Sequence, residues 1–457
     1  MSMLKVDLDL VKKYNVPGPR YTSYPPATQF TNEVSNEIFV EQIRANNQGA
    51  RDLSLYFHLP FCQSLCWFCG CTTVITTDQK KSGDYIKYLE REMDLTKPLL
   101  NPNRKVTQLH FGGGTPTFSL PDEIRRLGEM IHSRFTFAPD VEAGVEVDPR
   151  RLTRDHLVAL REVGFNRTSM GVQDNEAVVQ KAVHRIQPFE MTKQTVEWMR
   201  ELGFQSINID LIYGLPYQTP ASFMKTVDEI LSLKPDRFAV FNYAHVPWLK
   251  PAQKIFKTEA FPSPETKLEI LKLTIEKITS EGYVYIGMDH FARVEDELAV
   301  SQRQKTLQRN FQGYSTRGGA DIYAFGMSAI SQAEGFYWQN QKELPAYYAS
   351  LDAGKLPFHR GYVMTEEDRI RRTTIMRLMC DLGLDYTAMS KRLGMDFKEH
   401  FAQEIESLDD MEADGLLVKT PEGLVVSDLG RLLIRNIAMR FDAYSGIRKE
   451  NRFSRTI

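Results

Sequence analysis

Short β-rich runs alternate with amphipathic helical segments between residues 53 and 288, and this alternation limits the fold more than any other feature. Strands joined through helices run parallel, because each helical crossover returns the chain to the same edge of the sheet. We expect an α/β fold with a partial (β/α)6-type barrel. Six strands are predicted, with a seventh candidate at 283–288: 53–59, 106–111, 143–147, 167–173, 206–213 and 237–243.

The chain of 457 residues is long enough for one large α/β domain and a smaller one. The proline- and aromatic-rich start predicts an extended arm that covers the site, and the end predicts a small, mainly helical domain with a β-hairpin. That last domain is winged-helix-like, and we interpret it as a cover for the barrel. The expected divisions are an arm at 1–50, the barrel at 51–330, a connector at 331–360 and the C-terminal domain at 361–457.

Charge and apolar patterning exclude several classes of protein. Lysine and arginine number 57 and aspartate and glutamate 59, so the net charge of −2 predicts no nucleic acid partner and no anionic membrane partner. The N-terminus has no apolar signal segment, and no run of about 18 apolar residues predicts a membrane span. Five cysteines without dispersed pairing fit a reducing compartment. We therefore expect a cytoplasmic enzyme.

Four of the five cysteines fall within ten residues, as Cys62, Cys66, Cys69 and Cys71. Thiolates packed this tightly indicate a metal or an iron–sulfur cluster rather than disulfides. A cluster held by three of them keeps one iron open for a substrate. The alternative is a structural zinc site, with all four thiolates or with His58 as the fourth ligand. Four zinc ligands within so short a loop would be strained, so the cluster is favoured.

Other unusual residues also follow predicted strands. The carboxyl ends of parallel strands form the active-site edge of an α/β fold, so these motifs predict one shared site. In order, they are the cysteines after the first strand, Gly112–Pro116 after the second, Glu146 and Asp148 at the third, Gln173 after the fourth and Asp210 in the fifth.

The C-x3-C-x2-C spacing, with Phe68 before the third cysteine and a strand before the first, resembles the radical S-adenosylmethionine (SAM) superfamily. The resemblance implies that Cys62, Cys66 and Cys69 ligate a [4Fe–4S] cluster whose fourth iron chelates SAM. It further implies that an electron from the cluster cleaves SAM to methionine and a 5′-deoxyadenosyl radical. Cys71 is left over, outside the expected ligand set.

Longer strings resemble one family of this superfamily, the oxygen-independent coproporphyrinogen III oxidases (dehydrogenases) of haem biosynthesis. They extend over essentially the whole chain, including the arm and the C-terminal domain. The strings are 20–25, 56–62, 109–116, 145–150, 165–174, 208–216, 241–245, 286–293, 310–314 and 453–455.

The family resemblance implies two bound SAM molecules. The positions expected to contact the cluster-bound molecule are Tyr56, Gly113, Glu146 and Ile330. The positions expected to contact the second are Phe68, Gly114, Thr115, Gln173, Arg185, Asp210 and Ala244. The chemistry is compatible, because carboxylates can hold ribose hydroxyls or an amino group, and an arginine can pair with a methionine carboxylate.

The family resemblance also implies the reaction. Two propionates of coproporphyrinogen III would be oxidatively decarboxylated to vinyl groups without oxygen, giving protoporphyrinogen IX. An electron donor such as flavodoxin or ferredoxin is expected, and we expect a monomer because the C-terminal domain can cover the barrel. No acid–base dyad is needed, so no catalytic side chain is assigned.

Four propionates require cationic or backbone donors in the pocket. The candidate arginines are Arg20, Arg293, Arg309 and Arg317, and the candidate aromatic residues for stacking on pyrroles are Tyr21, Tyr24 and Phe311. Two other interpretations remain open. One is a haem-binding chaperone of the same superfamily, and the other is a zinc-stabilised α/β binding protein.

Overall fold

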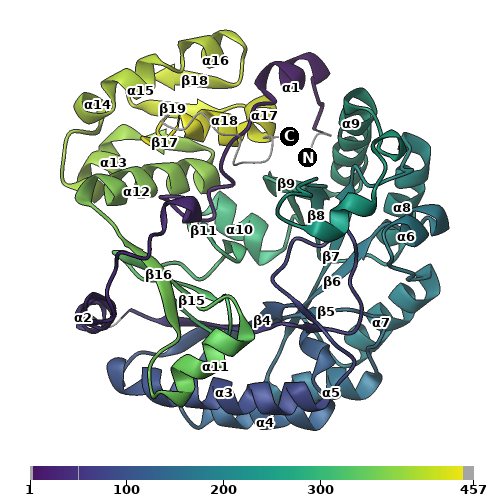
Figure 1. Cartoon of the computed structure of the whole chain (residues 1–457). Helices are drawn as coiled ribbons and strands as arrows, with labels where there is room; N and C mark the ends of the chain where they lie inside the picture. Colours follow the sequence, from purple (N-terminus) through teal and green to yellow (C-terminus); the bar gives the residue numbers. More distant parts are fainter. Residues whose placement is uncertain (1–3, 50, 446–457) are drawn as a thin grey trace.

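The computed structural model describes residues 4–49 and 51–445 (Figure 1). The family-like string at 453–455 therefore lies outside the described residues. Within them, a large curved sheet with outer helices carries a smaller C-terminal domain, which confirms the predicted α/β class. Among the described helices, none combines the length and the apolar character that a membrane-spanning segment needs.

Six parallel strands form the centre of the sheet, each hydrogen-bonded to the strand that follows it in this series. The first, fourth and fifth of them begin and end at the predicted residues. The strands are β1 (Leu53–Leu59), β4 (Val106–Gly113), β5 (Phe137–Val147), β6 (Arg167–Gln173), β7 (Ser206–Tyr213) and β8 (Arg237–Asn242).

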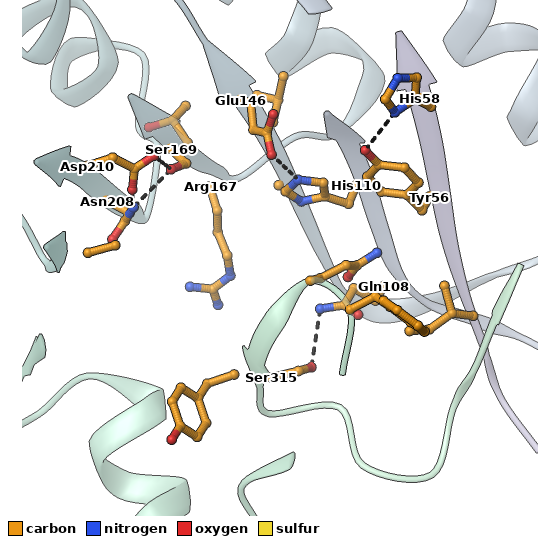
Figure 2. A pocket seen from close by; sticks show the side chains of 18 of the residues that line it. Tyr56, His58, Gln108, His110, Glu146, Arg167, Ser169, Asn208, Asp210 and Ser315 are labelled. Carbon is orange, nitrogen blue, oxygen red and sulfur yellow. Dashed lines mark hydrogen bonds and ion pairs between the residues drawn. The ribbon is translucent and has the colours of Figure 1, made fainter. Parts of the chain in front are cut away.

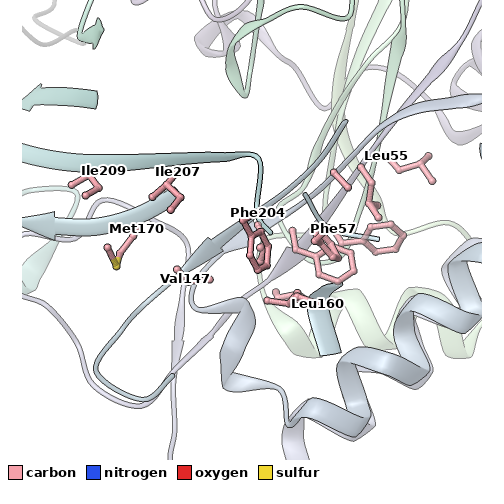
Figure 3. Packing of buried hydrophobic residues seen from close by; sticks show 14 of the residues in the cluster. Leu55, Phe57, Val147, Leu160, Met170, Phe204, Ile207 and Ile209 are labelled. Carbon is pink, nitrogen blue, oxygen red and sulfur yellow. The ribbon is translucent and has the colours of Figure 1, made fainter. Parts of the chain in front are cut away.

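Helices connect these strands and cover the outer face of the sheet, where they form an arc in Figure 1. They are α3 (Lys80–Thr96), α4 (Pro121–His132), α5 (Arg154–Val163), α6 (Ala177–Ala182), α7 (Phe189–Glu201), α8 (Pro220–Ser232) and α9 (Pro264–Ser280). Side chains alternate across a strand, so each strand has a helix-facing side and an inner side. In β7, Ile207 and Ile209 are fully buried in the core (Figure 3), while Asn208 and Asp210 face a cavity.

The seventh candidate strand does not continue the parallel series. This strand, β9 (Tyr283–Gly287), pairs antiparallel with β10 (His290–Arg293), which in turn pairs antiparallel with β8. The next segment turns back immediately after Met288, because no helix separates β9 from β10. A seventh parallel strand, β13 (Asp321–Phe325), instead joins the opposite side of the series, beside β1.

The stretch 331–360, for which we expected a connector, has regular structure of its own. Antiparallel strands extend the sheet beyond β13, so the sheet does not end where the barrel boundary was expected. The elements are β14 (Ile330–Gln332), β15 (Phe336–Asn340), α11 (Leu344–Asp352) and β16 (Phe358–Val363). Between β10 and β13 lie α10 (Glu297–Arg303), β11 (Gln308–Asn310) and β12 (Gly313–Ser315).

The C-terminal domain is mainly helical and contains the predicted hairpin. Most of its helices are short, with interruptions at Phe401, Leu408 and Leu433, which turn into the core of this domain and are almost fully buried. The elements are α12 (Glu366–Asp381), β17 (Gly383–Asp385), α13 (Tyr386–Leu393), α14 (Phe397–His400), α15 (Ala402–Glu406), α16 (Asp409–Ala413), β18 (Leu417–Thr420), β19 (Gly423–Val426), α17 (Asp428–Leu432) and α18 (Ile434–Met439).

The arm has two helices, α1 (Leu8–Tyr14) and α2 (Asn36–Asn46), joined by chain that is largely without regular structure. Helix α1 lies between α9 and the C-terminal domain (Figure 1). The Leu4 N–H donates to Thr279 Oγ1 at 3.2 Å, and the Tyr14 hydroxyl donates to Asp414 at 2.5 Å. The arm therefore connects the barrel to the C-terminal domain.

Candidate active site

A cavity of about 720 Å³ lies on the inner side of the parallel strands (Figure 2). Four of the predicted SAM contacts line it, together with the left-over cysteine: Tyr56, Glu146, Asp210, Ile330 and Cys71. They come from β1, β5, β7, β14 and the cysteine loop (residues 62–75), which confirms that these distant segments of the chain meet at one place.

Glu146 is the anchored carboxylate of this cavity. Its oxygens accept the Gly113 N–H at 3.0 Å and lie 3.6 Å from His110 Nε2. Burial would raise the pKa of Glu146, but the bonds to His110 and Gly113 outweigh it and hold the pKa below its ordinary value. Nearly half of the side chain, 46%, stays accessible because it faces the cavity. An ionised carboxylate is therefore presented to any ligand there.

Tyr56 is held by two rings. Its hydroxyl lies 3.3 Å from His58 Nδ1, and its ring stacks on His110 with centroids 5.8 Å apart. His58 Nε2 lies 2.9 Å from the Thr72 carbonyl in the cysteine loop. Burial lowers the pKa of His58, so this imidazole is neutral and couples the loop to Tyr56.

Gly113 and Gly114, two of the predicted SAM contacts, pack closely against the chain that leads into the cysteines. A Cβ on Gly113 would lie 2.6 Å from the His58 ring, and a Cβ on Gly114 would lie 2.5 Å from the Pro60 carbonyl oxygen. Thr115 continues this contact, because its N–H donates to the Phe61 carbonyl at 2.9 Å.

The cysteine loop is closed by parallel pairing of β2 (Phe61–Cys62) with β3 (Val74–Ile75). Cys62 Sγ lies 3.3 Å from the Thr115 hydroxyl. Burial raises the pKa of Cys62 to about 11, and the contact with Thr115 opposes this. Deprotonation of this thiol therefore requires a compensating positive charge such as a bound metal.

Two arginines, which lie beside Cys66, supply positive charge there. Arg150 Nη2 lies 3.3 Å and Arg185 Nη1 lies 3.6 Å from Cys66 Sγ. Asp148 holds both guanidinium groups, with Nη-to-oxygen distances of 2.6 and 3.3 Å. Burial alone would raise the pKa of Asp148, but the two arginines lower it to about 2. Asp148 was expected at the shared site without an assigned role, and Arg150 was not among the predicted site residues, although the Asp-Pro-Arg sequence after a predicted strand contained it.

Cys69 and Cys71 differ although they are two residues apart. A hydrogen bond between their side chains lowers the pKa of Cys69 to about 6 and raises the pKa of Cys71 well above its ordinary value. The two sulfurs therefore titrate together, and the bond between them favours the thiolate of Cys69.

The donors suit a cluster better than a single zinc ion. Zinc needs its ligands around one point. Among the described residues, no group of three histidine, cysteine or acidic side chains is arranged closely enough to hold a single ion. Three cysteines on a closed loop, with arginines against one sulfur, match the anionic thiolate set of an iron–sulfur cluster.

The predicted contacts of a second SAM molecule lie mostly around the cysteine loop rather than in the cavity. Gln173 and Arg185 lie together over Gly171, whose carbonyl accepts from Arg185 Nη2 at 2.7 Å. Gln173 Oε1 and Arg185 Nε are buried without a hydrogen-bond partner. Such atoms indicate a missing polar ligand.

Phe68 and Ala244 are brought together by a residue that sequence reasoning missed. The Gln253 amide donates to the Phe68 carbonyl at 3.2 Å and to the Ala244 carbonyl at 3.3 Å. Gln253 is 1% exposed, so the loop after β8 is tied firmly to the cysteine loop. No sequence signal singles out this glutamine.

Asp210, the remaining contact, differs from Glu146 in its charge state. Burial and the nearby Glu146 carboxylate raise the pKa of Asp210 to about 7, although Asn208 and Ser169 donate to it at 2.6 and 3.2 Å. These bonds appear in Figure 2. Asp210 is therefore half-protonated near neutral pH and can donate as well as accept.

Only some of the candidate substrate contacts lie at the cavity. Phe311 lines the cavity. Arg293 and Arg317 lie away from it, because Arg293 bonds the Pro235 carbonyl at 3.1 Å and Arg317 pairs with Asp140 at 2.7 Å. Tyr21 and Tyr24 are fully buried, and their hydroxyls bond the chain at Asp442 and Ala443. These two tyrosines were candidates for stacking, but they pack the arm against the C-terminal domain.

Comparison with known proteins agrees with this geometry. Residues 56–230 match the family model described as the radical SAM superfamily, and residues 364–433 match the one described as the HemN C-terminal domain. The cofactors of the radical SAM family are a [4Fe–4S] cluster and SAM.

Curated relatives match over the full length. The chain is 46% identical to the oxygen-independent coproporphyrinogen III oxidase of Escherichia coli, over 100% of both chains. It is 44% identical to that of Synechocystis, over 98% of this chain and 97% of the relative. A solved structure, titled as coproporphyrinogen III oxidase (HemN) from Escherichia coli, a radical SAM enzyme, superposes with a TM-score of 0.92 at 45% identity, covering 97% of this chain and 100% of that one. The chain therefore belongs to the oxygen-independent coproporphyrinogen III oxidase family of the radical SAM superfamily.

Proposed function

We propose that this protein oxidatively decarboxylates two propionates of coproporphyrinogen III to vinyl groups, giving protoporphyrinogen IX in haem biosynthesis. The observation that carries the proposal is a single cavity of about 720 Å³ that joins the strand ends beside the cysteine loop to an interior large enough for a tetrapyrrole. Full-length identity of 44–47% to oxidases of this name supports it.

Cys62, Cys66 and Cys69 would hold the [4Fe–4S] cluster. The arginines at Cys66, the hydrogen bond at Cys69 and the hydroxyl at Cys62 all favour thiolates. When bound, the cluster and SAM supply one-electron cleavage of SAM to a carbon radical able to take a hydrogen atom from an unactivated carbon. The chain itself orients the reactants and excludes water.

Tyr56, Gly113, Glu146 and Ile330 are the proposed contacts of the cluster-bound SAM. The ionised Glu146 carboxylate, fixed by Gly113 and His110, suits an ammonium or ribose group. For a second SAM, the unpartnered Gln173 and Arg185 atoms support the remaining assignments. That group comprises Phe68, Gly114, Thr115, Gln173, Arg185, Asp210 and Ala244.

We propose that a small acidic electron carrier, such as a flavodoxin or ferredoxin, supplies the electron. The loop after β8 touches the cysteine loop, since Lys250 Nζ donates to the Cys71 carbonyl at 2.8 Å. This loop exposes Trp248 and Leu249 by 69% and 68% and also carries Lys254. Exposed apolar side chains among lysines suit an acidic protein partner. A cytoplasmic monomer is also proposed, since all five cysteines are free thiols and the arm joins the two domains.

The test is an anaerobic assay with the reconstituted, reduced protein, SAM and coproporphyrinogen III. The porphyrinogen products are then oxidised to porphyrins, separated and identified by mass spectrometry. We expect a product with two vinyl groups, and methionine and 5′-deoxyadenosine formed alongside it. Binding without any vinyl product would reject the oxidase and favour the haem-binding chaperone.

A further inference from the structure

Three arginines from distant parts of the chain gather behind one end of the cavity wall. Arg20 comes from the arm, Arg309 from β11 and Arg435 from α18, and we call them the arginine end. Arg309 Nη2 donates to the Arg20 carbonyl at 3.0 Å, and Arg435 Nε donates to the Pro19 carbonyl at 3.1 Å. The arm backbone therefore holds the guanidinium groups together.

Aromatic rings connect the arginine end to the cavity. The Arg20 guanidinium lies 5.9 Å from the centre of the Phe241 ring, and that of Arg309 lies 4.7 Å from the centre of the Tyr314 ring. Between these rings lies His290, in edge contact with both. Phe241, His290 and Tyr314 all line the cavity, so the arginines lie directly behind its wall.

Several buried donors at this end have no hydrogen-bond partner. They are Arg309 Nε and Nη1, Arg237 Nη2, His290 Nδ1 and Gln312 Nε2. Arg237, His290 and Gln312 line the cavity, and Arg309 is only 5% exposed. Buried polar nitrogens are nearly always bonded in native proteins, so this concentration of exceptions indicates a ligand rich in acceptor atoms.

One of the charges at this end, that of Arg309, has no acidic partner among the described residues. Arg20 pairs with Asp289, but within the described residues no carboxylate lies at ion-pair distance from Arg309. Burial, followed by Arg435 and Arg309, lowers the pKa of Arg20 to about 9. Burial and the neighbouring arginines lower the pKa of His290 to about 3, so its imidazole stays neutral. Like charges held together away from water are costly unless an anion joins them.

We propose that Arg20, Arg309 and Arg435 bind the side-chain carboxylates of the tetrapyrrole, so that the arm and the C-terminal domain complete the substrate site. This inference rests on the proposed function. Glu146 and Asp210 line the same cavity, and their carboxylates would repel propionates. The cavity therefore has an acidic part that suits the cofactor and a basic end that suits the substrate, and the two together orient the macrocycle.

A consequence concerns the product. Coproporphyrinogen III has four carboxylates and the product has two, so each turnover removes half of the anionic charge that the arginine end recognises. Charge-assisted bonds to carboxylates are the strongest polar contacts available to such a ligand. The site therefore prefers substrate over product.

The test measures binding of coproporphyrin III, the stable oxidised form with four carboxylates, and of protoporphyrin IX, with two, to the reconstituted holoprotein by fluorescence. Arg309→Gln should weaken coproporphyrin III binding by about tenfold to a hundredfold and protoporphyrin IX binding less. Arg309→Lys keeps the positive charge and should therefore lose less affinity for coproporphyrin III than Arg309→Gln. The matched control is Arg293→Gln, because Arg293 also stacks on a tyrosine, at 5.5 Å, but lies away from the cavity.

Iron and sulfide content and far-ultraviolet circular dichroism check that each variant folds and holds its cluster. If Arg309→Gln fails to fold, Arg20→Gln provides the same binding test and should also weaken coproporphyrin III binding. This variant should fold, because 35% of the Arg20 side chain is accessible and its loss leaves no void in the core. Affinities within twofold of wild type in the folded variants, or equal losses in Arg293→Gln, would overturn the inference. Failure of the wild type to form vinyl product would instead overturn the proposed function, because the binding measurement does not depend on turnover.

Discussion

Replacing Gly113 by alanine tests how the turn after β4 supports the site. Gly113 has a φ of +113°, and a Cβ there would lie 2.6 Å from two atoms of the His58 ring. Alanine at positive φ costs roughly 1–2 kcal/mol. Ordinary carbon contacts lie near 3.5 Å or beyond, so the ring must also move by about 1 Å.

Movement of His58 has its own cost. Its ring bonds Tyr56 at 3.3 Å and the Thr72 carbonyl at 2.9 Å, and losing such bonds costs about 1 kcal/mol each. Overpacking adds about 1–3 kcal/mol. We expect Gly113→Ala to destabilise the barrel by about 4–7 kcal/mol and to lower the iron content, because Thr72 belongs to the cysteine loop.

The matched control is Gly164→Ala, where φ is +108° and no heavy atom lies within 4 Å of the new Cβ. It carries the same backbone strain without the clash, so we expect it to cost only about 1–2 kcal/mol. Urea unfolding of the cluster-free proteins, followed by circular dichroism, gives both values from the shift in midpoint. Equal shifts for the two variants would refute the argument that packing against His58 requires the glycine.

Four substitutions around the cysteine loop and the cavity give further outcomes. Cys66→Ser should lose the cluster on anaerobic reconstitution while Cys71→Ala keeps it, as iron and sulfide analysis will show; loss in both would make Cys71 a ligand. The pKa of Asp148 is lowered from 3.8 to about 2 in the folded protein, so its ionised carboxylate contributes about 2 kcal/mol to the free energy of unfolding above pH 4. This contribution is lost as the pH falls towards 2. Asp148→Asn should remove the contribution, so the urea midpoint should change less between pH 2 and 5 than in the wild type. The folded pKa of Asp210 is raised to about 7, so stability falls as the pH rises from about 4 to 7, by up to about 4 kcal/mol. Asp210→Asn should abolish that fall, and an unchanged pH profile would contradict the assignment.

Local patterns predicted the elements of the barrel well, because each depends on short-range periodicity. The limits of β1, β6 and β7 match the predicted ranges. The sequence pattern did not predict the antiparallel pairing of β9, because the residue pattern of a strand is the same whether it pairs parallel or antiparallel. Pairing is decided by the connection, and the tight turn at Met288 that joins β9 to β10 carries no helical period.

The motifs at the strand ends predicted which residues would share a site, since parallel strands end at one edge. Their partners were not predictable. Asp148 holds two arginines against Cys66, and Gln253, which is 185 residues from Phe68, ties Phe68 to Ala244. Such contacts between distant residues have no local sequence signal.

By itself, the sequence determined the order of strands and helices, the thiolate loop and the strand ends at which polar residues would meet. These features depend on neighbours along the chain. Only the tertiary structure decided which arginines gather behind the cavity wall, because Arg20, Arg309 and Arg435 come from three segments whose approach depends on packing of the arm and the C-terminal domain. The charge states of Glu146 and Asp210 were decided in the same way, since burial and neighbouring groups, rather than residue type, set each pKa.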